Sequence, residues 1–144
     1  MSGVVIIGAG HAAGQAAASL RQAKYEGDIN IIGDEAHIPY QRPPLSKAYL
    51  KGEQSADKVF LRAESFYADR NIKLKLNTTA TAIDTAAKTV ALNTDETLSY
   101  DHLLISTGSR PRKLSIEGSD LPGIHYLRTM DDVDGLRDGM RPDA

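Results

Sequence analysis

Three glycines near the start of the chain have the spacing of a phosphate-binding loop. Gly8 and Gly10 directly follow the branched apolar run 4–7, and small residues at helical spacing come next. Glycine permits a tight turn and lets the main chain approach a ligand closely. A helix beginning at Gly10 would direct its unpaired N–H groups and the positive end of its dipole at that ligand. The ligand expected at this loop is an anion such as a pyrophosphate.

An acidic pair follows the second apolar run at the distance that a dinucleotide site requires. The run 29–32 leads to Asp34 and Glu35, about 20 residues beyond the loop, where a carboxylate can hold a ribose hydroxyl. The spacing Gly-x-Gly-x-x-Ala that begins at Gly8 is the small-residue variant of the dinucleotide fingerprint, with Gly14 one position late. A plain strand–helix–strand unit with a solvated acidic turn is the alternative.

Buried strands and a helix of small residues would position this loop and this acid. The apolar runs 4–7, 29–32 and 103–106 predict strands buried on both faces, as in a parallel sheet. Between the first two runs, alanines and a leucine recur at helical spacing. We expect that helix to run to about Lys24 and to be stopped by Gly27.

The last of these strands ends in Thr107 and Gly108, which should bring backbone to the carboxyl edge of the sheet, where ligands bind. Short alternating segments with tight turns precede it, too close together for crossover helices, so they predict an antiparallel meander. Its strands are expected at 80–83, 89–92 and 97–100. The fold class is therefore α/β, a parallel sheet with helices on one face and an antiparallel β-meander on the other.

The remaining segments complete this scheme. Prolines in 36–44 predict an ordered loop. Lys47 falls in the first turn of a short predicted helix, where the dipole disfavours a cation, which hints at a functional role; a lysine that simply reaches into water is the alternative. The other expected elements are helices at 45–50, 63–70 and 129–140, strands at 72–76 and 124–127, and the start of a linker at 142–144.

Composition bounds the class of protein. The 144 residues are 41% hydrophobic and 25% charged, which fits a globular domain, and the net charge of −2 gives no indication of a nucleic-acid partner. No apolar run approaches the ~20 residues of a membrane span, and Met1 leads almost directly into the first strand, so we expect a cytoplasmic protein. Without cysteine, and with scattered histidines, no metal site is expected.

Three further motifs stand in order along the chain. Segment 39–47 reads Pro-Tyr-Gln-Arg-Pro-Pro-Leu-Ser-Lys, and segment 97–108 ends in Ser-Thr-Gly. Segment 125–129 reads His-Tyr-Leu-Arg-Thr. Together they resemble the flavoprotein NAD(P)H–ferredoxin reductases of the rubredoxin, putidaredoxin and Rieske-oxygenase type, within the pyridine nucleotide-disulfide oxidoreductase superfamily. Ser106 stands where alanine is usual. The resemblance covers nearly the whole chain and implies a Rossmann-like FAD/NAD(P)-binding fold.

The resemblance also implies a cofactor and assigns residues to it. In this family the first glycine-rich loop holds FAD. Asp34 falls at the adenosine ribose, with Glu35 as the less favoured neighbour. Arg42 would approach the phosphate–ribityl side, and Lys47 would lie at the flavin ring and tune it. The other cofactor-binding positions are Gly8, Gly10, His11, Ala12 and Ala13 at the pyrophosphate, Ala80 at the adenine, and Thr107, Gly108 and Arg110 along the flavin.

A function and a domain organisation follow from the same resemblance. Such proteins oxidise NADH or NADPH, transfer a hydride to FAD and pass single electrons to a ferredoxin-type iron–sulfur protein. Family members are considerably longer, so we expect residues 1–114 to be the N-terminal part of an FAD-binding domain. Residues 115–144 would connect it to an NAD(P)H-binding domain. This piece alone is expected to be inactive. The basic cluster of Arg110, Arg112 and Lys113 should steer an acidic carrier; a solvated loop is the alternative.

Rival readings of the chain differ in their chemistry. A thiol–disulfide flavoenzyme of the glutathione reductase type carries a redox cysteine pair soon after the second strand, where this chain has segment 42–47 and no sulfur. A flavoprotein like apoptosis-inducing factor or monodehydroascorbate reductase shares that segment and stays open, as does a binding-only fragment without turnover. Acceptor turnover by the complete protein would separate these classes.

Overall fold

The computed structural model describes residues 3–140, and its contacts divide the chain into two units. We call them the sheet unit, Met1–Tyr40 with Phe60–Gly108, and the connector unit, Gln41–Val59 with Ser109–Ala144. Each unit is described by itself below. The expected linker at 142–144 lies outside the described residues.

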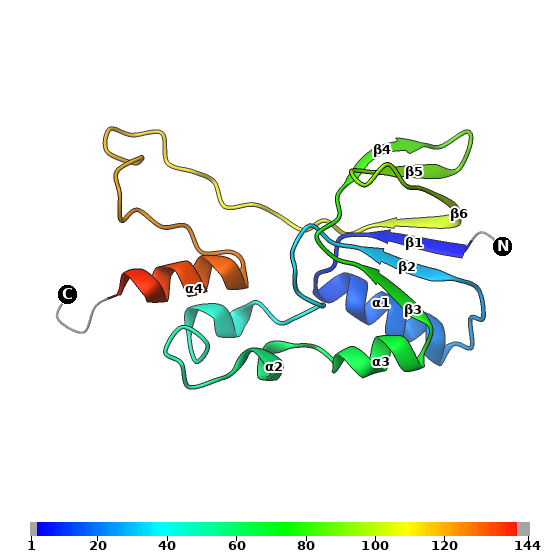
Figure 1. Ribbon diagram of the computed structural model, residues 1–144, viewed down its shortest axis with the longest axis horizontal. Helices are drawn as coiled ribbons and strands as arrows, with labels where there is room; N and C mark the ends of the chain where they lie inside the picture. Colours follow the sequence, from blue (N-terminus) through cyan, green and yellow to red (C-terminus); the bar gives the residue numbers. More distant parts are fainter. Residues whose placement is uncertain (1–2, 141–144) are drawn as a thin grey trace. The chain divides into compact units, whose positions relative to one another are not determined.

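The sheet unit is built on one mixed six-stranded sheet with the order β3-β2-β1-β6-β5-β4 (Figure 1). Parallel pairing joins β1 to both β2 and β6, and β2 to β3, whereas β4, β5 and β6 pair antiparallel. The strands are β1 Gly3–Ile7, β2 Ile29–Ile32, β3 Ile72–Lys75, β4 Ala80–Asp84, β5 Thr89–Leu92 and β6 Thr97–Ile105.

Two apolar layers cover the two faces of the parallel strands. Helices α1, His11–Gln22, and α3, Glu64–Asp69, lie on one face, and the meander β4–β6 folds over the other (Figure 1). The helix-side core consists of Val4, Ile6, Ala13, Ala17, Ile29, Ile31, Ile38, Tyr67 and Ile72. The meander-side core consists of Val5, Ile7, Ile32, Val90, Leu92 and Tyr100. Alternate side chains of β1 thus enter opposite cores, which confirms the predicted fold class.

Two strands predicted separately form one. The prediction of strands at 97–100 and 103–106 was wrong, because β6 runs unbroken from Thr97 to Ile105. Its first residues pair with β5, and from Tyr100 onward it pairs with β1, across a register shift at Gly3. Within the described residues, the other edge of β6 beyond Tyr100 has no strand beside it. An open edge of this kind is a template for another strand.

Helix α1 ends at Gln22, slightly before the predicted Lys24, and Lys24 rather than Gly27 turns the chain. The backbone of Lys24 is left-handed, with φ of 61°, and the N–H of Tyr25 donates to the Leu20 carbonyl at 3.0 Å. This bond satisfies a carbonyl that the helix end would leave unpaired. Gly27 lies in the loop that follows.

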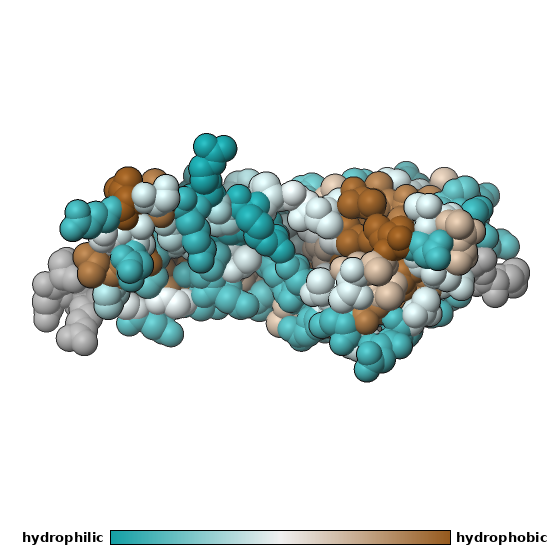
Figure 2. All heavy atoms as spheres, turned by 90° about the horizontal axis from the view of Figure 1, so that it is seen from above, coloured by the Kyte–Doolittle hydropathy of each residue, from teal (hydrophilic) through white to brown (hydrophobic). Residues whose placement is uncertain are grey.

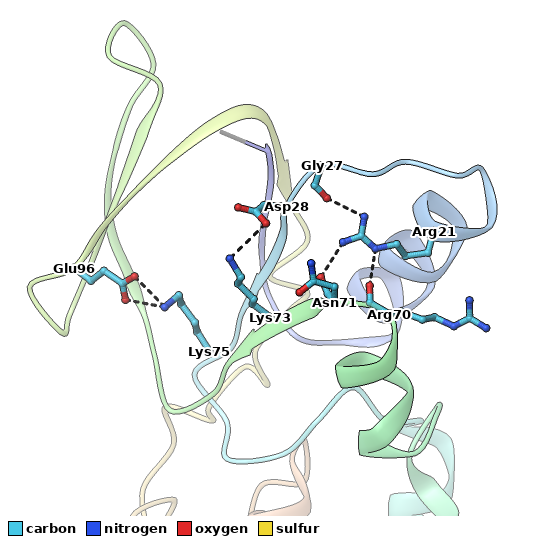
Figure 3. Close-up of polar contacts among 8 residues, drawn as sticks. All are labelled: Arg21, Gly27, Asp28, Arg70, Asn71, Lys73, Lys75 and Glu96. Atoms are coloured by element: carbon cyan, nitrogen blue, oxygen red, sulfur yellow. Dashed lines mark hydrogen bonds and ion pairs between the residues drawn. The ribbon is translucent and has the colours of Figure 1, made fainter. Parts of the chain in front are cut away.

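Arg21 binds this helix end to two other segments of the sheet unit. Its guanidinium donates to the carbonyl oxygens of Tyr25 at 2.5 Å and Gly27 at 2.8 Å. It also donates to those of Arg70 at 2.7 Å and Asn71 at 2.8 Å, just after α3 (Figure 3). One side chain therefore joins the ends of α1 and α3 to the loop before β2. The sequence pattern did not identify this residue.

The connector unit contains the 3₁₀ helix η1, Pro43–Ser46, and the helices α2, Ala56–Val59, and α4, Met130–Gly139. Helix α4 confirms the predicted last helix, whereas the predicted helix at 45–50 was wrong. The N–H groups of Lys47 and Tyr49 both donate to the Pro44 carbonyl, so the chain leaves η1 in turns rather than an α-helix. The predicted strand at 124–127 was also wrong, because that stretch is irregular. Helix α2 was not predicted.

A buried tyrosine joins the two segments of the connector unit. The Tyr49 hydroxyl donates to Asp134 of α4 at 3.0 Å, and the Arg137 guanidinium lies 5.9 Å from the centre of the Tyr49 ring. Burial, together with the hydrogen bond to Asp134, raises the pKa of Tyr49. The phenol therefore stays a donor, and it holds the turns after η1 against α4.

Helix α4 begins with the capping box that its sequence predicts. The Thr129 hydroxyl accepts from the N–H of Asp132 at 3.1 Å, and the Asp132 carboxylate accepts from the N–H groups of Thr129 and Arg128. We expect Thr129→Ala to lower the free energy of unfolding by about 1 kcal/mol, measured by thermal denaturation at neutral pH. Thr85→Ala, in an exposed turn between β4 and β5, is the control. Equal losses in the two variants would contradict a specific capping role.

The same cap makes the connector unit sensitive to acid. Although burial opposes ionisation, the backbone and hydroxyl hydrogen bonds from Thr129, the N–H of Arg128 and the charge of Arg42 together lower the pKa of Asp132 below 3.8. The folded-state pKa is depressed, so the stabilisation is complete above the unfolded value and is lost as pH falls through the folded value. The cost of Thr129→Ala should therefore shrink in strong acid.

Apolar side chains remain exposed in both units. Figure 2 shows hydrophobic patches on the face seen from above in the Figure 1 orientation. In the sheet unit the exposed large apolar residues are Ile83, Leu104 and Ile105. In the connector unit they are Leu114, Ile116, Leu121, Ile124, Leu127 and Met140. Among residues 3–140, no helix has both the length and the hydropathy of a bilayer-spanning segment.

Candidate functional site

Gly8 makes the turn at the carboxyl end of β1, and no other residue fits there. Its φ is +108°, and a Cβ placed on it would lie 2.3 Å from the Ser106 carbonyl oxygen. The N–H of Gly8 donates to the Ile32 carbonyl at 2.8 Å, and the N–H of Ser106 donates to the Ile7 carbonyl at 2.7 Å. The turn is therefore held between the ends of β2 and β6.

Gly10 is different, because nothing in the described structure requires a glycine there. Its backbone is extended, with φ of −85°, and a Cβ built on it would meet no atom within 4 Å. It is the N-cap of the 12-residue helix α1, which has no side-chain cap and no acidic residue in its first turn. The open space above Gly10 and the uncapped N–H groups fit an anionic group held close to the backbone.

The helix start carries the other predicted pyrophosphate residues. His11 and Ala12 are exposed in the first turn of α1, and Ala13 is fully buried in the helix-side core. A Cβ on Gly14 would lie 2.8 Å from the Pro39 Cβ and 3.1 Å from the Leu61 side chain. In the dinucleotide fingerprint a third glycine allows the helix to pack closely on its neighbours. Here Gly14, one position later than that glycine, allows this close packing.

A glycine that the sequence analysis did not single out brings the acidic turn to this loop. A Cβ on Gly33 would lie only 2.4 Å from the Cβ of Ala9, so Gly33 allows the end of β2 to touch the turn after β1. Asp34 follows and is exposed. A glycine directly after a buried strand was the signal for this contact.

Glu35 has a structural partner. It is half-buried, and its carboxylate accepts a hydrogen bond from the Tyr40 hydroxyl at 2.5 Å. The N–H of Asn77 also donates to the Glu35 carbonyl at 3.1 Å. These bonds tie the loop after β2 to the segment after β3. The two acids therefore differ, since Glu35 holds the loop and the more exposed Asp34 lies nearer the glycine loop in sequence.

The remaining predicted positions of the sheet unit lie beside this edge. Ala80 begins β4, is half-buried and packs on the meander-side core. Thr107 and Gly108 follow β6 and are exposed, with Gly108 at φ of 70°. The N of Thr107 lies 3.0 Å from the Cβ position of Gly8, so the two glycine turns adjoin. The carboxyl ends of β1, β2 and β6 thus bring the loop, Asp34 and Thr107 together.

Three predicted residues belong to the connector unit. Arg42 is the N-cap residue of η1 and donates to the Arg128 carbonyl at 2.5 Å, which joins the segment before η1 to the one before α4. Lys47 is exposed and follows the last residue of η1, so the predicted position in the first turn of an α-helix was wrong. Arg110 is exposed in an irregular segment.

The chain resembles known reductases over nearly its whole length. It is 46% identical to the rubredoxin-NAD(+) reductase of Pseudomonas putida over 134 residues, which cover 93% of this chain and 35% of that protein. The crystal structure of the ferredoxin reductase for the CYP199A2 system from Rhodopseudomonas palustris matches with a TM-score of 0.89 and 44% identity. That match covers 96% of this chain and 34% of the reductase.

The putidaredoxin reductase in a covalent complex with putidaredoxin matches with a TM-score of 0.84 and 39% identity, over 96% of this chain and 34% of that one. The chain therefore spans about a third of the length of the curated relatives it matches. The sequence profile described as pyridine nucleotide-disulphide oxidoreductase matches residues 2–144. With the glycine loop, the uncapped helix and the acidic turn at one edge of the sheet, the chain belongs to the pyridine nucleotide-disulphide oxidoreductase family.

Proposed function

We propose that this chain is the FAD-binding, N-terminal part of a flavoprotein reductase that carries electrons from NAD(P)H to a ferredoxin-type iron–sulfur protein. The observation that carries the proposal is the open space above Gly10, at the start of an uncapped helix. A Cβ on Gly10 would meet no atom within 4 Å, so a pyrophosphate could approach the backbone there. The relatives named as rubredoxin-NAD(+) and ferredoxin–NAD(P)(+) reductases support the same function.

The chain's own residues would bind and orient the cofactor. FAD, when bound, supplies the capacity to take a pair of electrons from NAD(P)H and release them one at a time. The N–H groups at the start of α1 would hold the pyrophosphate, and Asp34 the adenosine ribose. We also propose that Ala80 contacts the adenine, and that Thr107, Gly108 and Arg110 line the flavin. For Arg42 and Lys47 we propose the ribityl side and the flavin ring.

The proposed domain organisation keeps residues 1–114 as part of the FAD domain and 115–144 as the connector to an NAD(P)H domain. We also propose that the reductase works in the cytoplasm. Because the chain spans about a third of its relatives, we expect it to bind FAD weakly by itself. Tight stoichiometric binding of FAD by a monomeric chain, measured by calorimetry, would contradict this expectation.

Spectroscopy and turnover test the function itself. A complete reductase carrying this chain should show flavin absorbance bands that NADH or NADPH bleaches. Adding an oxidised ferredoxin-type protein should restore those bands through single-electron transfer. If the protein reduces only quinones or small oxidants and ignores iron–sulfur proteins, the reductase assignment fails. If no flavin is retained, the cofactor assignment fails.

The two acids after β2 should respond differently to substitution. We expect Asp34→Ala to weaken FAD binding by about one to two decades, because a carboxylate that accepts ribose hydroxyls contributes roughly 1.5–3 kcal/mol. Glu35→Ala should affect binding less, and should instead cost about 1 kcal/mol of stability by removing the acceptor for Tyr40. Flavin dissociation constants and thermal unfolding separate the two effects. Equal losses of affinity would show that the ribose acid is wrongly chosen.

The basic cluster of Arg110, Arg112 and Lys113 is proposed to steer an acidic carrier. All three side chains are exposed. Exposed charges are screened over about 10 Å at ~0.1 M salt, so the rate of carrier reduction should fall as ionic strength rises. Changing the three residues to Gln should lower the second-order rate and flatten its salt dependence, while NAD(P)H still reduces the flavin normally. An unaltered rate and salt slope would place the docking face elsewhere.

A further inference from the structure

A second concave site lies in the sheet unit, apart from the glycine loop. It is a pocket of about 570 Å³ lined by residues at the starts of β1 and β2, by residues of β3 up to its last residue, and by the start of β6 with the turn before it. Its lining residues are Gly3, Asp28, Asn30, Lys73, Lys75, Glu96, Leu98 and Ser99. None of these lining residues is among the positions assigned to the cofactor. Its volume lies within the usual range for small-ligand sites, roughly 300–1,000 Å³.

Asn30 gives this pocket an unused hydrogen-bonding group. Its side chain belongs to the central strand β2 and lines the pocket, yet the residue is only 9% exposed. Among residues 3–140, no group pairs with its side-chain amide. Strand β2 is otherwise isoleucine throughout, so Asn30 is its one polar side chain. Its amide therefore offers a hydrogen-bond donor and an acceptor to a polar molecule in the pocket.

Two ion pairs border the same space (Figure 3). Lys75 binds both oxygens of Glu96, at 3.0 and 2.8 Å. Lys73 lies 3.4 Å from Asp28, and these two side chains are 53% and 40% exposed. The longer and more exposed pair contributes at most about 1 kcal/mol, so it opens easily. The Lys75–Glu96 pair is the shorter of the two.

We propose that this pocket binds a small zwitterion of the free amino acid class, which enters between Lys73 and Asp28. The argument rests on charge balance, because the four charged side chains sum to zero. An anion bound to Lys73 would leave Asp28 unpaired beside a second negative charge, and a cation on Asp28 would leave Lys73 unpaired. A zwitterion satisfies both, its carboxylate on Lys73 and its ammonium on Asp28, and the Asn30 amide hydrogen-bonds to it. This site is independent of the proposed reductase function.

The test uses the ¹⁵N-labelled chain and L-glutamine as the probe. We expect saturable shifts of the Asn30, Lys73 and Ser99 amide signals, with a dissociation constant of order 1 mM. N-acetyl-L-glutamine lacks the ammonium and L-glutamine methyl ester lacks the carboxylate, so each should bind about tenfold more weakly. Equal binding of the N-acetyl form would make this an anion site and overturn the proposal. No saturable shift below ~10 mM L-glutamine would make it a hydrated groove only.

Variants separate the pocket from general charge effects. Lys73→Gln and Asp28→Asn should each lower the affinity for L-glutamine about tenfold without changing the thermal unfolding midpoint. Lys51→Gln is the matched control, because Lys51 forms an exposed ion pair with Glu53 at 3.8 Å in the connector unit. Loss of binding in the control as well, or retention of full affinity in both pocket variants, would overturn the proposal.

Discussion

Gly8→Ala is expected to destabilise the chain severely, whereas Gly10→Ser should leave it folded and weaken FAD binding. The added methyl group at Gly8 would lie 2.3 Å from the Ser106 carbonyl, on a backbone with φ of +108°. Strain of that kind costs roughly 1–3 kcal/mol before the clash is counted, so we expect a loss of more than about 3 kcal/mol. Thermal unfolding measures it.

At Gly10 the prediction has the opposite sign for stability. Serine is a better N-cap than glycine by a few tenths of a kcal/mol, and its Cβ would meet no protein atom. The same side chain would occupy the space at the start of α1, and its hydroxyl would accept hydrogen bonds from the N–H groups that are proposed to bind the pyrophosphate. FAD affinity should therefore fall at least about tenfold while the unfolding midpoint stays or rises. Destabilisation by Gly10→Ser, or unchanged FAD affinity, would contradict the assignment.

Arg21→Met is expected to give the largest loss of stability of any charged residue in the sheet unit. The guanidinium donates to four carbonyl oxygens, those of Tyr25, Gly27, Arg70 and Asn71. Because some of these bonds are exposed to water, the loss should be about 2–4 kcal/mol rather than their sum. For a chain of this size that lowers the unfolding midpoint by roughly 5–15 °C.

Arg62→Met is the matched control for Arg21. Arg62 is also half-buried, but it donates to one side-chain oxygen of Gln15 at 3.3 Å and lies over the Phe66 ring. Its loss should cost about 1 kcal/mol or less. Equal effects in the two variants would show that the carbonyl contacts of Arg21 do not hold the helix ends together.

The sequence alone was sufficient for the elements whose signal is local. The apolar runs of β1 and β2, the glycine turn, and the acid after β2 all come from side-chain periodicity and from glycine. The capping box at Thr129 could also be predicted, because its two partners, Thr129 and Asp132, are three residues apart. The close spacing of the meander strands fixed their antiparallel order, since no crossover fits between them.

Other features depended on residues distant in the sequence. The unbroken β6 was missed because its two halves have different neighbours, β5 and then β1, and the break in the apolar pattern at Asp101 and His102 resembles a turn. The stretch 124–127 has the composition of a strand, yet it has no partner strand among the described residues. The turns after η1 are held by the hydrogen bond from Tyr49 to Asp134, 85 residues later in the chain.

The sequence by itself therefore determined the class of fold and the identity of the family, because each of the motifs that indicate them is a short continuous segment. Only the tertiary structure decided what each residue is for. It separated Gly8, which a carbonyl 98 residues later in the chain makes indispensable, from Gly10, where a Cβ would meet no atom within 4 Å. It showed that the Glu35 carboxylate accepts a hydrogen bond from Tyr40, and that Asn30 lines a polar pocket. These roles arise from packing and hydrogen bonding between segments that only folding brings together, and no local pattern records them.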